Sequence, residues 1–80
     1  MWNSYLSNVR VLVVDDQDFI RSLLRHILGV LGCTQITDKS NGQMAWEIIR
    51  DSPPDMLIVD WEMSPMDGIE LVNKVRSYPA

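Results

Sequence analysis

Two short apolar segments, each followed at once by aspartate, constrain the fold of this chain more than any other feature. Residues 9–14 lead into Asp15 and Asp16, and residues 56–59 lead into Asp60. Runs this apolar and this short are typical of parallel strands buried on both faces. In open α/β sheets, ligands bind at the carboxyl ends of such strands. The sequence therefore predicts a parallel sheet with carboxylates along its ligand-binding edge.

The segment after the first strand has the spacing of a helix. From residue 18 onward, apolar residues recur at helical spacing and predict one broad stripe facing the core: Phe19, Ile20, Leu23, Leu24, Ile27, Leu28 and Leu31. Arg21, Ser22 and Arg25 are assigned to the opposite, solvated face, and Gly32 is a plausible stop. Residues 34–39 are half polar, which predicts a short strand at the edge of the sheet.

Two further helices are expected. Ser40 and Gln43 fit a capping box that opens a helix ending near Arg50, before two prolines. Trp46 lies off the apolar side of this helix, and we expect it to pack partly against a neighbouring loop rather than to mark a partner surface. A third helix is expected after Asp67, a natural N-cap.

The element order is therefore strand and helix three times over. Right-handed crossovers, with the second returning across the opposite face of the sheet, give the strand order 2-1-3. This predicts an α/β fold with the first and third strand tips side by side at the point where the strand order reverses. Residues 1–7 are interpreted as a lead-in and residues 8–80 as one small domain.

The predicted topology brings Asp15, Asp16 and Asp60 together at one edge. Like charges this close repel one another unless a cation neutralises them. Hard carboxylate oxygens suit Mg²⁺, which is commonly held by one or two carboxylates together with substrate phosphate. The sequence thus suggests a Mg²⁺-assisted phosphate site.

Charge and cysteine content narrow the possible partners. The formal net charge is −4 and no Lys/Arg cluster is present, which argues against direct binding of nucleic acid or an anionic membrane. The single cysteine, Cys33, excludes an intramolecular disulfide, and nothing resembles a signal peptide or a membrane span. A cytoplasmic setting is expected.

Four motifs, in order and spacing, resemble the receiver domain of bacterial two-component response regulators. They are residues 11–16, residues 18–24, residues 41–45, and residues 54–63 together with 66–68. The resemblance implies a flavodoxin-like doubly wound sheet and a signalling domain rather than an enzyme. It implies that Asp60 accepts a phosphoryl group from a phosphohistidine on a sensor histidine kinase or phosphotransfer protein. It further implies that Mg²⁺ is bound directly by Asp16, largely through water by Asp15, and by the backbone carbonyl of Glu62.

The chain departs from the family pattern in two respects. Ser64 stands where the family usually has proline, with the proline displaced to Pro65, so Ser64 is expected to be extended; this bears on the path of the loop that carries the Glu62 carbonyl. The family sheet has five strands in the order 2-1-3-4-5, whereas these 80 residues hold three βα units. We therefore expect a truncated receiver with impaired phosphate acceptance, which forms a homodimer through the edge of its third strand.

Two other functions remain open at this point. Asp16, Gln17 and Asp18 after an apolar strand resemble the Asp-x-Asp start of haloacid-dehalogenase-type phosphotransferases, in which the first aspartate is the nucleophile. Phe19 and Ile20 occupy the place of the expected hydroxyl residue, and the Asp60 motif stays unexplained. The other possibility is a self-associating interaction module without phosphotransfer.

Overall fold

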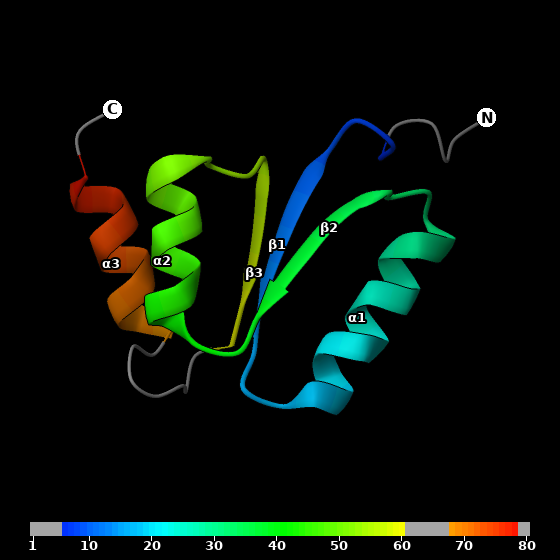
Figure 1. The fold of residues 1–80 in the computed structure, drawn as a ribbon, viewed down its shortest axis with the longest axis horizontal. Helices are drawn as coiled ribbons and strands as arrows, with labels where there is room; N and C mark the ends of the chain where they lie inside the picture. The colour runs from blue at the N-terminus through cyan, green and yellow to red at the C-terminus, as the bar shows by residue number, and fades with distance from the viewer. Residues whose placement is uncertain (1–5, 61–67, 79–80) are drawn as a thin grey trace.

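The molecule is a three-stranded parallel sheet with helices on both faces (Figure 1). The structure is a computed structural model, and it describes residues 6–60 and 68–78. The elements follow in the order β1 (Arg10–Val14), α1 (Asp18–Val30), β2 (Gln35–Lys39), α2 (Gly42–Asp51), β3 (Met56–Val59) and α3 (Gly68–Ser77). β1 pairs in parallel with β2 on one side and with β3 on the other. The predicted α/β class and the strand order 2-1-3 are confirmed.

The core lies on both faces of the central strand, because successive β1 side chains point to opposite sides. Val11 and Val13 pack with Leu28 of α1 and with Cys33. Leu12 and Val14 pack on the other face with residues of α2 and α3, namely Ala45, Trp46 and Leu71. α1 therefore covers one face of the sheet, while α2 and α3 cover the other (Figure 1).

The start of α2 differs from the prediction by one residue. The N-cap is Asn41, whose side-chain oxygen accepts a hydrogen bond from the Met44 N–H at 2.9 Å. The expected capping box of Ser40 and Gln43 is wrong, because the helix begins at Gly42 and the residue just before it, Asn41, supplies the capping oxygen. The Ser40 hydroxyl lies 3.8 Å from the Met44 sulfur instead.

Trp46 is a residue of α2, and its side chain is buried against the C-terminal end of α3. Its ring meets that of Tyr78 edge to face, with centroids 5.1 Å apart, and the Lys74 ammonium lies 5.1 Å from the Trp46 ring centroid. The expected packing partner was a loop, but the partner is α3 and the residue that follows it. Trp46 thus joins the two helices on their side of the sheet.

The apolar stripe of α1 is only partly used. Leu24 and Leu28 contact the sheet, whereas Phe19 is 73% exposed and Leu23, Ile27 and Leu31 are also exposed. The expectation that the whole stripe faces the core is wrong. In the part of the chain that the structure describes, α1 is the one helix on this face, so only its inner side finds apolar cover.

Candidate metal centre

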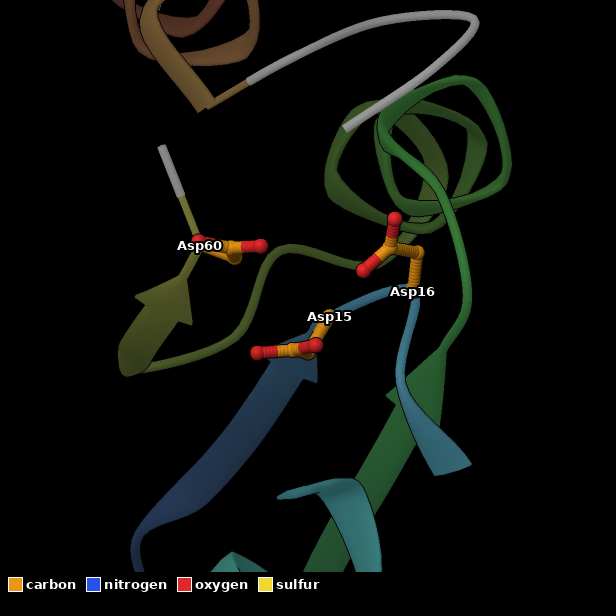
Figure 2. Close-up of side chains that lie close together, drawn as sticks. All are labelled: Asp15, Asp16 and Asp60. Carbon is orange, nitrogen blue, oxygen red and sulfur yellow. The ribbon is translucent and has the colours of Figure 1, made fainter. Parts of the chain in front are cut away.

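Three carboxylates meet at the carboxyl edge of the sheet. One oxygen from each of Asp15, Asp16 and Asp60 lies within 4.8 Å of the other two (Figure 2). Asp15 is buried, Asp60 is half-buried and Asp16 is exposed. The side chains predicted as a cluster are therefore brought together, while Glu62, predicted to offer its backbone carbonyl, lies outside the described residues.

Backbone hydrogen bonds hold the tips of the strands in register. The Asp15 N–H donates to the Lys39 carbonyl of β2 at 3.2 Å. The Asp60 N–H donates to the Val14 carbonyl of β1 at 2.9 Å. The backbone hydrogen bonding between the strands thus continues one residue past the end of β1 and one residue past the end of β3. It fixes the backbone positions of Asp15 and Asp60.

The β1–α1 turn, residues 15–17, is closed by the Asp15 side chain. One Asp15 carboxylate oxygen accepts a hydrogen bond from the Gln17 N–H at 2.9 Å, as in an Asx-turn. Gln17 is the N-cap residue of α1, and its carbonyl accepts the Arg21 N–H at 3.1 Å. Asp16 is left at the exposed apex of this turn.

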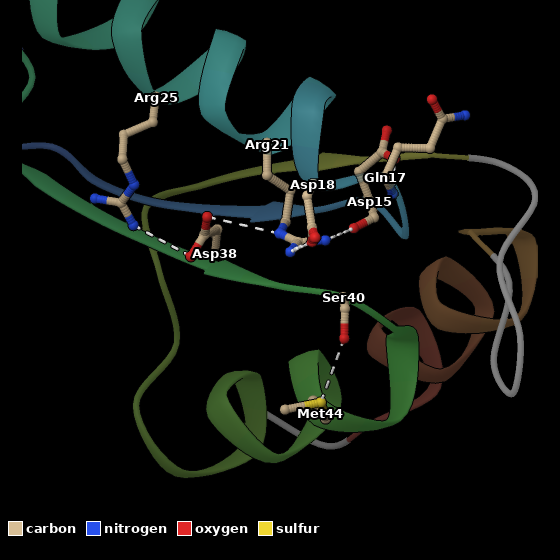
Figure 3. Close-up of polar contacts among 8 residues, drawn as sticks. All are labelled: Asp15, Gln17, Asp18, Arg21, Arg25, Asp38, Ser40 and Met44. Carbon is tan, nitrogen blue, oxygen red and sulfur yellow. Dashed lines mark hydrogen bonds and ion pairs between the residues drawn. The ribbon is translucent and has the colours of Figure 1, made fainter.

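Arg21 is the residue of this site that the sequence interpretation missed. It was assigned to a solvated face, but its side chain is only 16% exposed. Its guanidinium donates to the Asp15 backbone carbonyl at 2.7 Å and pairs with Asp18 and Asp38 (Figure 3). The spacing of Asp18 and Arg21, three residues apart on a helix, was the available signal for part of this network.

A pair of residues with shifted pKa values lies at the opposite edge of the sheet. A side-chain hydrogen bond from Arg50 holds the pKa of Asp51 below its usual range, and the same bond raises the pKa of Arg50. Both residues are at the C-terminal end of α2, far from the carboxylate cluster (Figure 1). They belong to the exposed surface of that helix and take no part in the site.

The donor set of the cluster fits Mg²⁺. Three carboxylate oxygens within 4.8 Å of one another are hard ligands, which Mg²⁺ prefers over nitrogen or sulfur. A cation would also offset the mutual repulsion of three like charges. The exposure of Asp16 and the partial burial of Asp60 leave the cluster open to solvent and to a second molecule.

Comparisons with known proteins agree on one family. A family model described as the response regulator receiver domain matches residues 11–80. The probable chemotaxis protein CheY of Rhizobium etli is 38% identical over 76 residues, which are 95% of this chain and 59% of that protein. Chemotaxis protein CheY1 of Helicobacter pylori is 37% identical over 70 residues, covering 86% of this chain and 56% of that protein. The chain thus spans little more than half the length of these relatives.

Solved structures show the same likeness. The N-terminal domain of a response regulator receiver protein from Methanoculleus marisnigri superposes with a TM-score of 0.84 at 30% identity, covering 91% of this chain and 58% of that one. The receiver domain of the histidine kinase CKI1 from Arabidopsis thaliana, complexed with Mg²⁺ and BeF₃⁻, gives a TM-score of 0.87 at 25% identity. That match covers 94% of this chain and 59% of the other.

Proposed function

The chain belongs to the response regulator receiver domain family, and on that premise we propose that it is the phosphoacceptor module of a phosphorelay. Asp60 takes the phosphoryl group from a phosphohistidine on a sensor histidine kinase or phosphotransfer protein. The observation that carries the proposal is the position of Asp60 at the tip of β3, beside Asp15 and Asp16. On this proposal the chain is a signalling module rather than an enzyme.

The same proposal assigns Mg²⁺ to the carboxylate cluster. Asp15, Asp16 and Asp60 would hold the ion, with the Glu62 backbone carbonyl as a further ligand. Support comes from the oxygen donor set and from the similar CKI1 receiver domain complexed with Mg²⁺. When bound, the ion supplies positive charge that neutralises the acids and stabilises the transferring phosphoryl group.

The chain's own residues fix the nucleophile. One Asp60 carboxylate oxygen forms a P–O bond while the P–N bond of the phosphohistidine breaks. The imidazole, protonated on its other nitrogen, takes the electron pair and leaves as neutral histidine. The product on this chain is an acyl phosphate at Asp60. The hydrogen bond from the Asp60 N–H to Val14 anchors the nucleophile to β1, and the bond from Gln17 to Asp15 anchors the neighbouring acid.

We expect phosphoryl transfer to Asp60 to be slower in these 80 residues than in a complete receiver domain. The resemblance implies a hydroxyl residue on a fourth strand and a lysine on a fifth, and the two lysines present lie elsewhere. Lys74 is over Trp46, and Lys39 lines a hollow with Met44 and Glu47. Removing one contact to developing charge typically costs about 3 kcal/mol of transition-state stabilisation.

Labelling with acetyl phosphate and Mg²⁺ tests the proposal. The acyl phosphate, trapped by reduction and mapped by mass spectrometry, should be at Asp60 and should be absent from Asp60→Asn. A complete receiver domain, run in parallel, should label faster. Labelling at Asp16 that survives Asp60→Asn would support the haloacid-dehalogenase-like alternative, and no labelling at either residue would favour an interaction module without phosphotransfer.

The free edge of β3 supports self-association. Among the described residues β3 pairs only with β1, and Met56 on it is 41% exposed. A free edge of unpaired backbone groups is a template for another strand. An antiparallel two-fold pairing of β3 with its copy would give a closed homodimer with strand order 2-1-3-3′-1′-2′. Sedimentation at micromolar concentration should show this dimer; a compact, folded monomer would contradict it.

The remaining expectations concern the setting. None of the helices that the structure describes combines the length and the apolar character needed to span a bilayer. The proposal keeps a cytoplasmic location, where sensor kinases present their phosphohistidine, and it includes no direct contact with nucleic acid. Co-fractionation of the tagged chain with soluble proteins would support the location, and recovery with membranes would contradict it.

A further inference from the structure

We propose that Arg21 is a positioning residue, which sets the geometry of Asp15 and Asp16 and thereby the affinity of the site for Mg²⁺. The inference rests on the proposed function for the identity of the ion. Arg21 does not itself contribute a ligand. It acts through the β1–α1 turn, residues 15–17, which carries the two aspartates.

Arg21 closes this turn twice. Its Nη1 donates to the Asp15 backbone carbonyl at 2.7 Å, and its backbone N–H donates to the Gln17 carbonyl at 3.1 Å. Within the turn, the Gln17 N–H donates to the Asp15 carboxylate at 2.9 Å. The Arg21 guanidinium therefore holds the Asp15 backbone carbonyl, and the Gln17 N–H holds the Asp15 carboxylate. Together the two contacts restrain the peptide group between Asp15 and Asp16.

Two carboxylates aim the guanidinium at this carbonyl. Asp18, one turn earlier on α1, pairs with it, and the Asp38 Oδ2 of β2 lies 3.7 Å from its Nε (Figure 3). A planar guanidinium with five N–H donors can serve three acceptors at once, which a lysine ammonium does less well. Since the Arg21 side chain is only 16% exposed, water replaces these contacts poorly.

In the proposal Arg21 acts by orienting the turn, and the charge it carries is already balanced within its own network. Arg25 also pairs with Asp38, at 3.3 Å, so two arginines face two aspartates and the network is neutral. Loss of Arg21 would free the carbonyl of a buried residue. Changes in the ψ angle of Asp15 and the φ angle of Asp16, the soft dihedrals on either side of this peptide plane, would then shift the two aspartate side chains relative to each other.

A matched pair of variants separates orientation from charge. Arg21→Met and Arg25→Met remove the same charge from the same helix and the same partner, Asp38, but of the two only Arg21 also contacts the Asp15 carbonyl and Asp18. Losing a residue that orients metal ligands typically lowers metal affinity by about 10- to 100-fold. Because Arg21 acts through a backbone carbonyl, we expect Arg21→Met to raise the Kd for Mg²⁺ about tenfold, with Arg25→Met close to wild type. Arg21→Lys should restore little.

The measurements are calorimetric titration with Mg²⁺ and, in EDTA, hydrogen exchange of the Gln17 amide. Faster Gln17 exchange in Arg21→Met, but not in Arg25→Met, together with the weaker Mg²⁺ binding, is the expected result. Equal Mg²⁺ affinity in wild type and Arg21→Met would overturn the proposal, as would an equal loss in Arg25→Met. If wild type binds no Mg²⁺, the proposed function fails on its own, and unchanged Gln17 exchange would separately refute the role of Arg21.

A second variant covers the case in which Arg21→Met does not fold. Asp38→Asn leaves Arg21 in place but removes one of the carboxylates that orient it. We expect a smaller rise in the Kd for Mg²⁺, of about threefold, because the pairing with Asp18 remains. An Asp38→Asn protein with wild-type Mg²⁺ affinity and wild-type Gln17 exchange would contradict the proposal.

Discussion

Replacing Asp60 with asparagine should stabilise the fold without metal and remove most of the stabilisation that Mg²⁺ gives. The side chains have nearly the same shape, so the substitution mainly deletes a charge. In the carboxylate cluster Asp60 faces two other acids, and one oxygen of each lies within 4.8 Å of the others. Unfolding separates Asp60 from Asp15 and Asp16, which are adjacent in the sequence, so these two repulsions weigh against the folded state.

The size of the effect follows from this separation. Two unit charges 4.8 Å apart repel by about 0.9 kcal/mol in the dielectric of water. Asparagine at position 60 removes two such pairs, which gives about 2 kcal/mol of added stability, or about 10 °C in Tm for a domain of this size. Mg²⁺ at one hundred times its Kd would stabilise wild type by about 2.7 kcal/mol. The stability advantage of Asp60→Asn over wild type in EDTA should therefore shrink sharply in Mg²⁺.

Urea unfolding followed by circular dichroism, at low ionic strength and one protein concentration, provides the measurement. Glu47→Gln is the matched control, since it removes the same charge from an exposed position on α2, outside the cluster. An Asp60→Asn protein no more stable than wild type in EDTA would refute the reasoning. So would an equal gain from Glu47→Gln, because it would assign the effect to net charge.

Three further outcomes are expected. Asn41→Ala should lower the free energy of unfolding by about 1 kcal/mol through loss of the α2 cap, while Ser40→Ala should change it little, as urea unfolding can measure. Leu71→Ala, at a fully buried position, should cost about 2–5 kcal/mol, a large part of the stability of an 80-residue domain, visible as a drop in Tm. The pKa of Asp51 is lower in the folded state than in the unfolded state. Its pairing with Arg50 therefore stabilises the fold at pH values above the unfolded-state pKa, and this stabilisation is lost as the pH falls through the folded-state pKa. Because both side chains lie on the exposed surface of α2, Asp51→Asn should leave the free energy of unfolding at pH 7 within error of wild type.

The carboxylate cluster could be predicted from the sequence because it depends on few choices. An apolar run that ends in aspartate predicts both a buried strand and a polar tip, and parallel strands end at the same edge. Once the order 2-1-3 is inferred, Asp15 and Asp60 must be neighbours. The cap of α2 was placed one residue too early, because Ser40 and Asn41 are adjacent and both side chains cap helices well, so the sequence pattern does not separate them.

The rotation of α1 about its own axis is the feature that the apolar pattern could not fix. Seven apolar residues spread over a broad arc, and many rotations bury some of them. The helix settles with Leu24 and Leu28 against the sheet, toward one side of that arc. Arg21 precedes Leu28 by seven residues, which places it only about 20° away around the axis. The same rotation therefore leaves Phe19 in solvent and carries Arg21 over the strand tips, to the Asp15 carbonyl. The polar contacts of Arg21 near the first turn and the packing of Leu28 near the last turn together fix the rotation of α1 about its axis. The rotation that leaves part of the apolar stripe exposed is therefore the one that places Arg21 at the site.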